Sequence, residues 1–143
     1  MTKSKRSHLT MAAALLAVTF VSLAGLAQAQ SPLRLRATIP FAFYAGETLM
    51  PAGQYQVERA ANGVMRIFCQ EARKSVLLNT FGVSQRFREE AHARFVFNKY
   101  GEAYLLSEMW WQDQQEGRKT FTSPIERELA QNGTPVRTTV ALQ

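Results

Sequence analysis

Chemically reactive side chains are scarce in this sequence of 143 residues. It contains one cysteine, Cys69, and His92 is the one histidine outside the first 29 residues. A lone cysteine excludes an internal disulfide framework, and a lone histidine excludes a metal site built from several histidines. Asp113 is the single aspartate, so a serine-type hydrolase has few candidates for its acidic member. The composition therefore favours a protein that is not an enzyme.

Motifs for cofactors and nucleic acid are missing as well. The chain has no Gly-rich phosphate loop and no cluster of His, Cys or Asp at metal-ligand spacing, so neither a metal nor another cofactor is predicted. Three of the 17 basic residues lie in the first 29 residues, which leaves 14 against 11 acidic residues and a net charge of +3. That charge is too small to indicate a nucleic-acid partner.

The first 29 residues have the pattern of a secretory signal peptide. The basic residues Lys3, Lys5 and Arg6 precede an apolar run over residues 11–27, and a small-x-small site ends at Ala29, where cleavage is expected. An uncleaved membrane anchor is the alternative, but it needs about 20 apolar residues and this run is shorter. No second apolar run follows. We therefore predict a secreted or periplasmic protein without a transmembrane segment after signal removal.

Turn residues recur about every ten positions in the remaining chain, which is typical of a protein with many short strands. Leu33–Ile39 alternates apolar and polar residues, and Pro40 predicts the end of that strand or an edge position. Ser75–Phe81 and Arg118–Phe121 are predicted as further strands. Seven or eight antiparallel strands indicate a mainly β domain over residues 30–131, either a small β-sandwich or a partly closed barrel.

A first β-hairpin is predicted over residues 54–70. A three-residue loop that ends in Gly63 is a common closure for such a hairpin. The resulting register places Glu58 opposite Arg66, so that two opposite charges meet on one face. The same register turns Cys69 toward the apolar face, and we interpret the thiol as part of the core.

A second hairpin is predicted over residues 92–111, closed in the same way by Lys99-Tyr100-Gly101. This register places His92 opposite Glu108, which is the pairing that a general base held by a carboxylate would need. An ordinary surface contact between the two residues is the favoured explanation of the pairing. A two-residue loop that pairs Lys99 with Glu102 is a further alternative. A hydrolase that uses His92 is therefore the less favoured functional hypothesis.

The chain changes character near its end. Ser123-Pro124-Ile125-Glu126 is a helix capping box with proline at the first helical position. It predicts a short C-terminal helix from Pro124 to about Gln131, which Asn132-Gly133 ends. Residues 132–143 are then a C-terminal tail, either a final strand over Val136–Val140 or a disordered segment.

The pair Trp110-Trp111 is the feature of the sequence that points most directly to a ligand. Neighbouring residues of a strand point to opposite faces of a sheet, so one ring can fill the core while the other covers an outer surface. An exposed ring would offer a platform to a sugar, a lipid or a protein partner. The alternative is a pair that fills the core and shields an edge. Trp110 and Trp111 are therefore the predicted ligand-binding residues, and no catalytic residue is predicted.

Much of the chain after the leader resembles a group of small uncharacterised secreted bacterial proteins. The matching stretches are Ile39-Pro40-Phe41-x-Phe43, Leu49-Met50-Pro51-Ala52-Gly53-x-Tyr55-x-Val57, Phe95-Val96-Phe97-Asn98-Lys99-Tyr100-Gly101 and Tyr104-Leu105-Leu106-Ser107. The resemblance implies export and a β-rich fold. It supplies no catalytic residue.

These observations together predict an exported, non-catalytic β-domain of the cell envelope that acts as a binding or interaction module. Its expected partner is an envelope protein, a glycan or a lipid. The alternative is a structural or stress-related envelope component that assembles through exposed strand edges or through its tail.

Overall fold

The computed structural model describes residues 34–85, 92–112 and 114–142, which belong to one compact unit. The prediction of a mainly β domain with one C-terminal helix is confirmed, while the predicted leader lies outside the described residues. No helix of the described ranges is long and apolar enough to span a membrane. The elements are β1 (Leu35–Ile39), β2 (Phe43–Ala45), β3 (Thr48–Met50), β4 (Gly53–Ala61), β5 (Val64–Cys69), β6 (Lys74–Ser84), β7 (Arg94–Tyr100), β8 (Ala103–Trp110), β9 (Glu116–Thr120), α2 (Pro124–Gln131) and β10 (Val136–Ala141).

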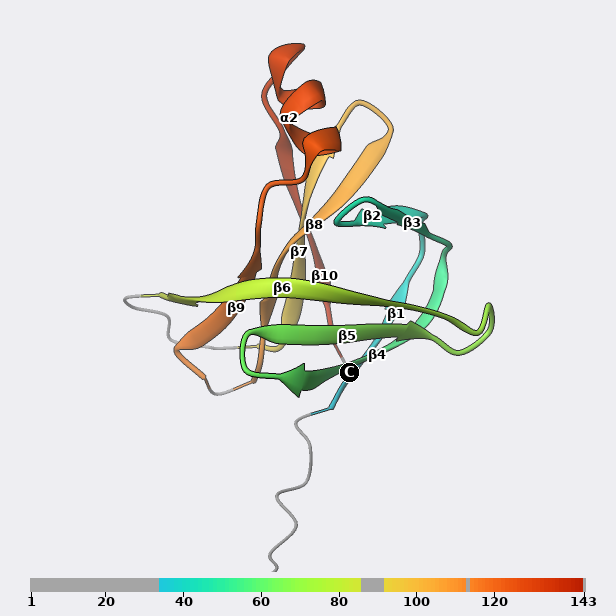
Figure 1. The fold of residues 1–143 in the computed structure, drawn as a ribbon, viewed down its shortest axis with the longest axis vertical. Helices are drawn as coiled ribbons and strands as arrows, with labels where there is room; N and C mark the ends of the chain where they lie inside the picture. The colour runs from blue at the N-terminus through green and yellow to red at the C-terminus, as the bar shows by residue number, and fades with distance from the viewer. Residues whose placement is uncertain (1–33, 86–91, 113, 143) are drawn as a thin grey trace, which may run out of the picture. The chain divides into compact units, whose positions relative to one another are not determined.

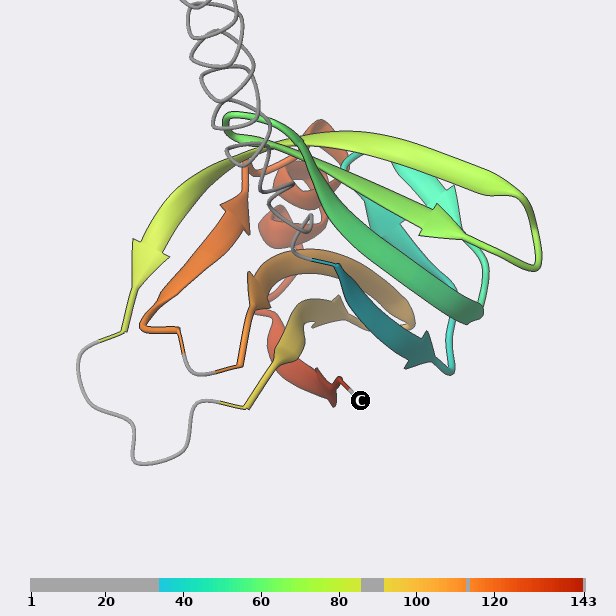
Figure 2. The same cartoon turned by 90° about the horizontal axis from the view of Figure 1, so that it is seen from below.

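The long strand β6 connects the two halves of the sheet (Figure 1). Its first part, Lys74–Asn79, pairs with β5, and its second part, Thr80–Ser84, pairs with β9. Beyond β5 the order continues with β4 and β1, and beyond β9 it continues with β8, β7 and β10, every one of these pairs being antiparallel. The sheet curls over on itself, so that β1 approaches β10 without pairing with it (Figure 2).

The short hairpin β2–β3 joins the sheet through a parallel pairing of Tyr44 with Leu105 on β8, so the sheet is mixed and not purely antiparallel as predicted. The hairpin also supplies part of the core. Phe43 is fully buried, and its ring centroid lies 5.2 Å from that of Tyr55 on β4 and 5.2 Å from that of Phe97 on β7. The hairpin explains why the described residues form ten strands where seven or eight were predicted. Strands of three residues are too short for an alternating pattern to be visible in the sequence.

The predicted register of the first hairpin is confirmed from Tyr55 to Arg59, but its predicted three-residue loop is wrong. A bulge after Arg59 pairs Ala61 with Val64, so the turn consists of Asn62 and Gly63 alone. Glu58 lies opposite Arg66, and their side chains form an ion pair with an O–N distance of 2.5 Å. Cys69 lies opposite Tyr55, and both are fully buried. The alternation predicted for the first strand is also confirmed, since Leu35, Ala37 and Ile39 face the core.

The predicted register of the second hairpin is wrong. Val96, and not His92, lies opposite Glu108. The chain turns at Gly101 and Glu102, with Gly101 at a φ of 58°, a conformation that two-residue hairpin turns require and that glycine adopts without strain. This later turn and a bulge in β8 together shift every pair of the hairpin.

The bulge in β8 lies at Ser107, which has no partner in the pairing with β7. Because one extra residue reverses the alternation of a strand, Leu106 before the bulge and both Met109 and Trp111 after it face the core. The hydroxyl of Thr120 donates to the carbonyl oxygens of Leu106, at 2.9 Å, and Ser107, at 3.2 Å. The last residue of β9 thus bonds the backbone at the bulge.

Helix α2 begins and ends where the sequence predicts. The Ser123 hydroxyl accepts the backbone N–H of Glu126 at 3.1 Å, and Asn132 is the C-terminal cap. The Glu126 carboxylate accepts the side-chain amide of Asn98 on β7 at 2.7 Å, which attaches the helix to the sheet. Burial and this carboxylate raise the pKa of Tyr100. The tail forms β10, which pairs with β7, so the predicted final strand is correct and the disordered alternative is not.

Tyr55 generates a pH-dependent prediction. Its hydroxyl donates to the Pro51 carbonyl, and burial, with Cys69 and Glu71 adding to it, raises the pKa of the phenol above its ordinary value. Because this pKa is higher in the folded state, the neutral phenol adds its full share to the free energy of unfolding below about pH 10. That share is lost as the pH rises toward the folded-state pKa. We expect Tyr55→Phe to lower the unfolding free energy by about 1 kcal/mol at neutral pH and to reduce its alkaline decline.

Denaturant unfolding between neutral and alkaline pH measures both effects. Tyr44→Phe is the matched control, because it removes a phenol hydroxyl from a side chain that is only half-buried. An alkaline decline in Tyr55→Phe as steep as in the wild type would contradict the prediction.

Candidate functional site

The two tryptophans lie on opposite faces of the sheet, as their adjacent positions predict. Trp111 belongs to the core cluster and Trp110 does not, yet the exposed fractions of Trp110 and Trp111 are only 5% and 4%. Neither ring therefore offers an open face, and the exposed platform that the sequence suggested is not formed. A role of this pair in ligand binding remains a prediction.

Trp110 is covered by residues of β7, β9 and β10 and by Glu108 of its own strand. Its ring lies over Gly117 of β9, and the guanidinium of Arg94 on β7 lies 5.0 Å from the ring centroid. The indole N–H donates to Oε2 of Glu108 at 2.9 Å, and Arg137 of β10 donates to the same oxygen at 2.8 Å. This cluster connects β7, β8, β9 and β10 on the outer face, so its geometry supports a role in holding the sheet together.

The indole nitrogen of Trp111 has no hydrogen-bond partner and is the one buried side-chain atom of the described residues in this state. Trp111 lines a small cavity of about 70 Å³ together with Arg59, Glu116 and Arg118. A polar cavity of this size has room for ordered water, which is a common partner of such donors.

The residues considered for catalysis are not brought together. Cys69 is fully buried, whereas His92 is exposed and lies two residues before β7. The Glu108 carboxylate bonds Trp110 and Arg137 instead of facing a histidine. Within residues 34–85, 92–112 and 114–142, no group of three His, Cys, Asp or Glu could hold a metal ion.

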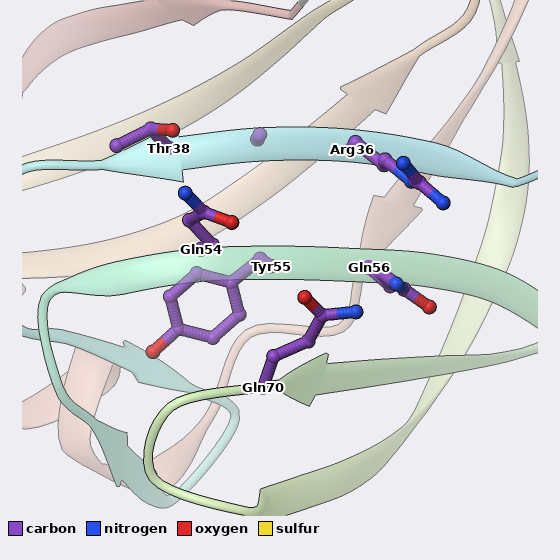
Figure 3. Close-up of a pocket in the computed structure, with 7 residues that line it drawn as sticks. Arg36, Thr38, Gln54, Tyr55, Gln56 and Gln70 are labelled. Carbon is purple, nitrogen blue, oxygen red and sulfur yellow. The ribbon is translucent and has the colours of Figure 1, made fainter.

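A shallow polar pocket of about 220 Å³ lies on the outer face of β1, β4 and the end of β5. Figure 3 shows the Gln54 side chain reaching toward β1 near Thr38, while Gln70 reaches toward β4. Arg36 and Gln56 are cross-strand partners in the same pocket. Most of these side chains are exposed and hence hydrated, so a ligand would have to replace water hydrogen bonds for little net gain.

A wider groove of about 590 Å³ lies beside β6 and has a different character. Its walls are the β2–β3 turn, residues 76–79 of β6, and the segment 120–124 between β9 and α2. Leu77 and Phe121 line the groove with exposed fractions of 63% and 58%. Phe81, 40% exposed, extends the apolar surface, because its ring centroid lies 5.0 Å from that of Phe121. We call Leu77, Phe81 and Phe121 the apolar rim.

Two of the three residues of the apolar rim stand out in the sequence, although neither is among the predicted site residues. Since Val76, Leu78 and Thr80 face inward, the positions between them face outward and should be polar. Leu77 and Phe81 break that rule. Phe121 carries no such signal, because it follows the last residue of β9.

Comparison with known proteins gives no information about function, so the candidate site is chosen from the surfaces described above. No protein-family model, no curated protein and no solved structure matches the chain. Of the two pockets described, the groove beside β6 is the better candidate site, because its exposed apolar groups gain free energy when they are covered.

Gly117 tests the structural role assigned to the Trp110 cluster. A Cβ atom at position 117 would lie 2.7 Å from two ring carbons of Trp110 and 3.0 Å from the Met109 carbonyl oxygen. We therefore expect Gly117→Ala to lower the unfolding free energy by about 1–3 kcal/mol. Gly82→Ala is the matched control, because Gly82 lies on the adjacent strand with nothing within 4 Å of the added atom. Equal stabilities of the two variants in thermal unfolding would refute the role.

Proposed function

We propose that this protein is an exported, non-catalytic interaction module whose partner is a polypeptide. The observation that carries the proposal is the apolar rim beside the groove. Large apolar side chains that remain exposed next to one another on a folded domain commonly mark interaction sites. Phe81 and Phe121 already contact each other, so a partner meets a surface that is partly pre-organised and loses less conformational entropy on binding.

Other features of the described residues favour a protein over a glycan or an ion. The groove is lined mainly by apolar and neutral groups, with Glu47 as the one charged residue among those that line it. Aromatic residues are enriched at the centres of protein interfaces. A glycan site would instead require directed polar groups around an aromatic face, whereas both tryptophans are buried.

Export is supported by the sequence alone. The basic start, the apolar run and the small-x-small site at Ala29 are typical of a cleaved signal peptide, and the resemblance to small secreted bacterial proteins agrees with this. The partner would then be a protein of the cell envelope or of the medium.

Site-specific cross-linking tests the interaction. A photoreactive phenylalanine analogue at position 121 is expected to form protein adducts in the producing bacterium, whereas the same analogue at Val136 is not. Val136 is the matched control because it is 66% exposed but lies on β10, outside the groove lining. Phe121→Ser is expected to weaken binding of the identified partner about tenfold, as loss of an interface anchor does. Lipid or glycan adducts at position 121, or equal adducts at both positions, would contradict the proposal.

Processing of the leader is tested separately. The full chain, expressed in a bacterium with a general export pathway, is expected to yield a mature protein that begins at Gln30. Intact-mass measurement of the exported fraction decides the question, and a protein that retains residues 1–29 would contradict export with cleavage.

A further inference from the structure

One edge of β6 has no neighbouring strand over half its length. Lys74–Asn79 pairs with β5 on one side, but β9 begins its pairing with β6 only at Thr80 and Thr120. After Thr120 the chain leaves the sheet and runs to α2 (Figure 1). No other strand of the described ranges pairs with this part of β6. Lys74–Asn79 therefore has an open edge, although β6 is an inner strand of the sheet.

The register identifies the backbone groups on the open edge. The N–H of Thr80 donates to the Gly63 carbonyl, with an N–O distance of 2.7 Å, at the end of the β5–β6 ladder. Because hydrogen-bonded and non-hydrogen-bonded pairs alternate in an antiparallel ladder, the even-numbered residues of β6 bond toward β5. The N–H and C=O groups of Ser75, Leu77 and Asn79 therefore point to the open edge.

This edge lacks the features that usually protect an edge from pairing. The β5–β6 register is continuous from Lys74 to Asn79, without a bulge, and residues 75–79 contain neither proline nor a charge. Bulges, prolines and charged side chains are the features that normally protect native edges. Lys74, at the beginning of the strand, is held aside, since its Nζ donates to the Leu49 carbonyl at 2.6 Å.

The open edge and the groove are the same place. Residues 76–79 line the groove, and its opposite walls are the Gly46–Thr48 turn and the segment that includes Phe121. A ligand in the groove therefore meets backbone donors and acceptors at strand spacing, an apolar side chain at Leu77, and almost no charge.

Resting on the proposed function, we infer that the partner binds by adding an extended segment of its own chain to β6, along Ser75–Asn79. Its backbone bonds the open edge, and its uncharged, apolar side chains contact Leu77 and Phe121. Strand addition of this kind derives affinity from main-chain hydrogen bonds and specificity from alternate side chains.

Other occupants fit the site less well. A lipid tail would cover Leu77 but leave the edge N–H and C=O groups without partners, which is costly once water is excluded. A second copy of this chain would bring its own β2–β3 turn and its own segment 121–124 into the groove. Two recessed edges of this kind cannot approach to the strand spacing of about 4.8 Å.

Peptide selection tests the inference. A phage-displayed library of random linear peptides is selected against the purified protein, and the peptide that binds most tightly is synthesised. It is expected to be an uncharged segment with alternating apolar residues.

Leu77→Pro removes the N–H on the open edge without disturbing the ladder to β5, since proline is tolerated at edges. This variant is expected to abolish binding. Leu77→Ala keeps the N–H and should weaken binding about tenfold. Val136→Ala is the control that should leave it unchanged.

Hydrogen exchange gives a second measurement that does not depend on the proline variant folding. Saturating the wild-type protein with the peptide is expected to slow the exchange of the Ser75, Leu77 and Asn79 amides at least about tenfold. Unchanged exchange of these amides, or binding that Leu77→Pro retains, would overturn strand addition while leaving the interaction module in place. Failure to select any peptide, or a dimer that Leu77→Pro dissociates, would also overturn the assignment.

Discussion

The structure depends on β6, whose eleven residues pair with two different strands in succession. Because β5 covers the first part of the strand and β9 covers the second, β6 connects the two halves of the curled sheet. The same arrangement leaves one edge of Lys74–Asn79 without a strand. The feature that connects the sheet thus also creates the surface that we assign to binding.

On the other half of the sheet, β8 occupies a similar central position. Its bulge at Ser107 turns Trp111 toward the core and leaves Trp110 on the outer face. There Gly117 gives the Trp110 ring space, and Glu108 and Arg137 hold it in place. The two tryptophans, which look like a binding feature in the sequence, are covered by packing on one side and by a polar cluster on the other.

The contrast between the two outer surfaces explains the choice of site. The polar pocket around Gln54 and Gln70 consists of groups that water already satisfies, so covering them gains little. The apolar rim and the open edge of β6 combine exposed Leu77 and Phe121 with backbone groups that an extended chain can bond. Both the hydrophobic effect and hydrogen bonding then favour the same occupant.

Local patterns determined much of this protein. The alternation of Leu35–Ile39, the Glu58–Arg66 pair and the Ser123 cap involve neighbours in the sequence or one tight turn, and the sequence alone predicts them. The bulge at Ser107, the burial of Trp110 and the open edge of β6 depend on which distant strands become neighbours. That pairing is decided by packing of the whole chain, because a strand shows in its own sequence which face is apolar but not which strand will cover its edge.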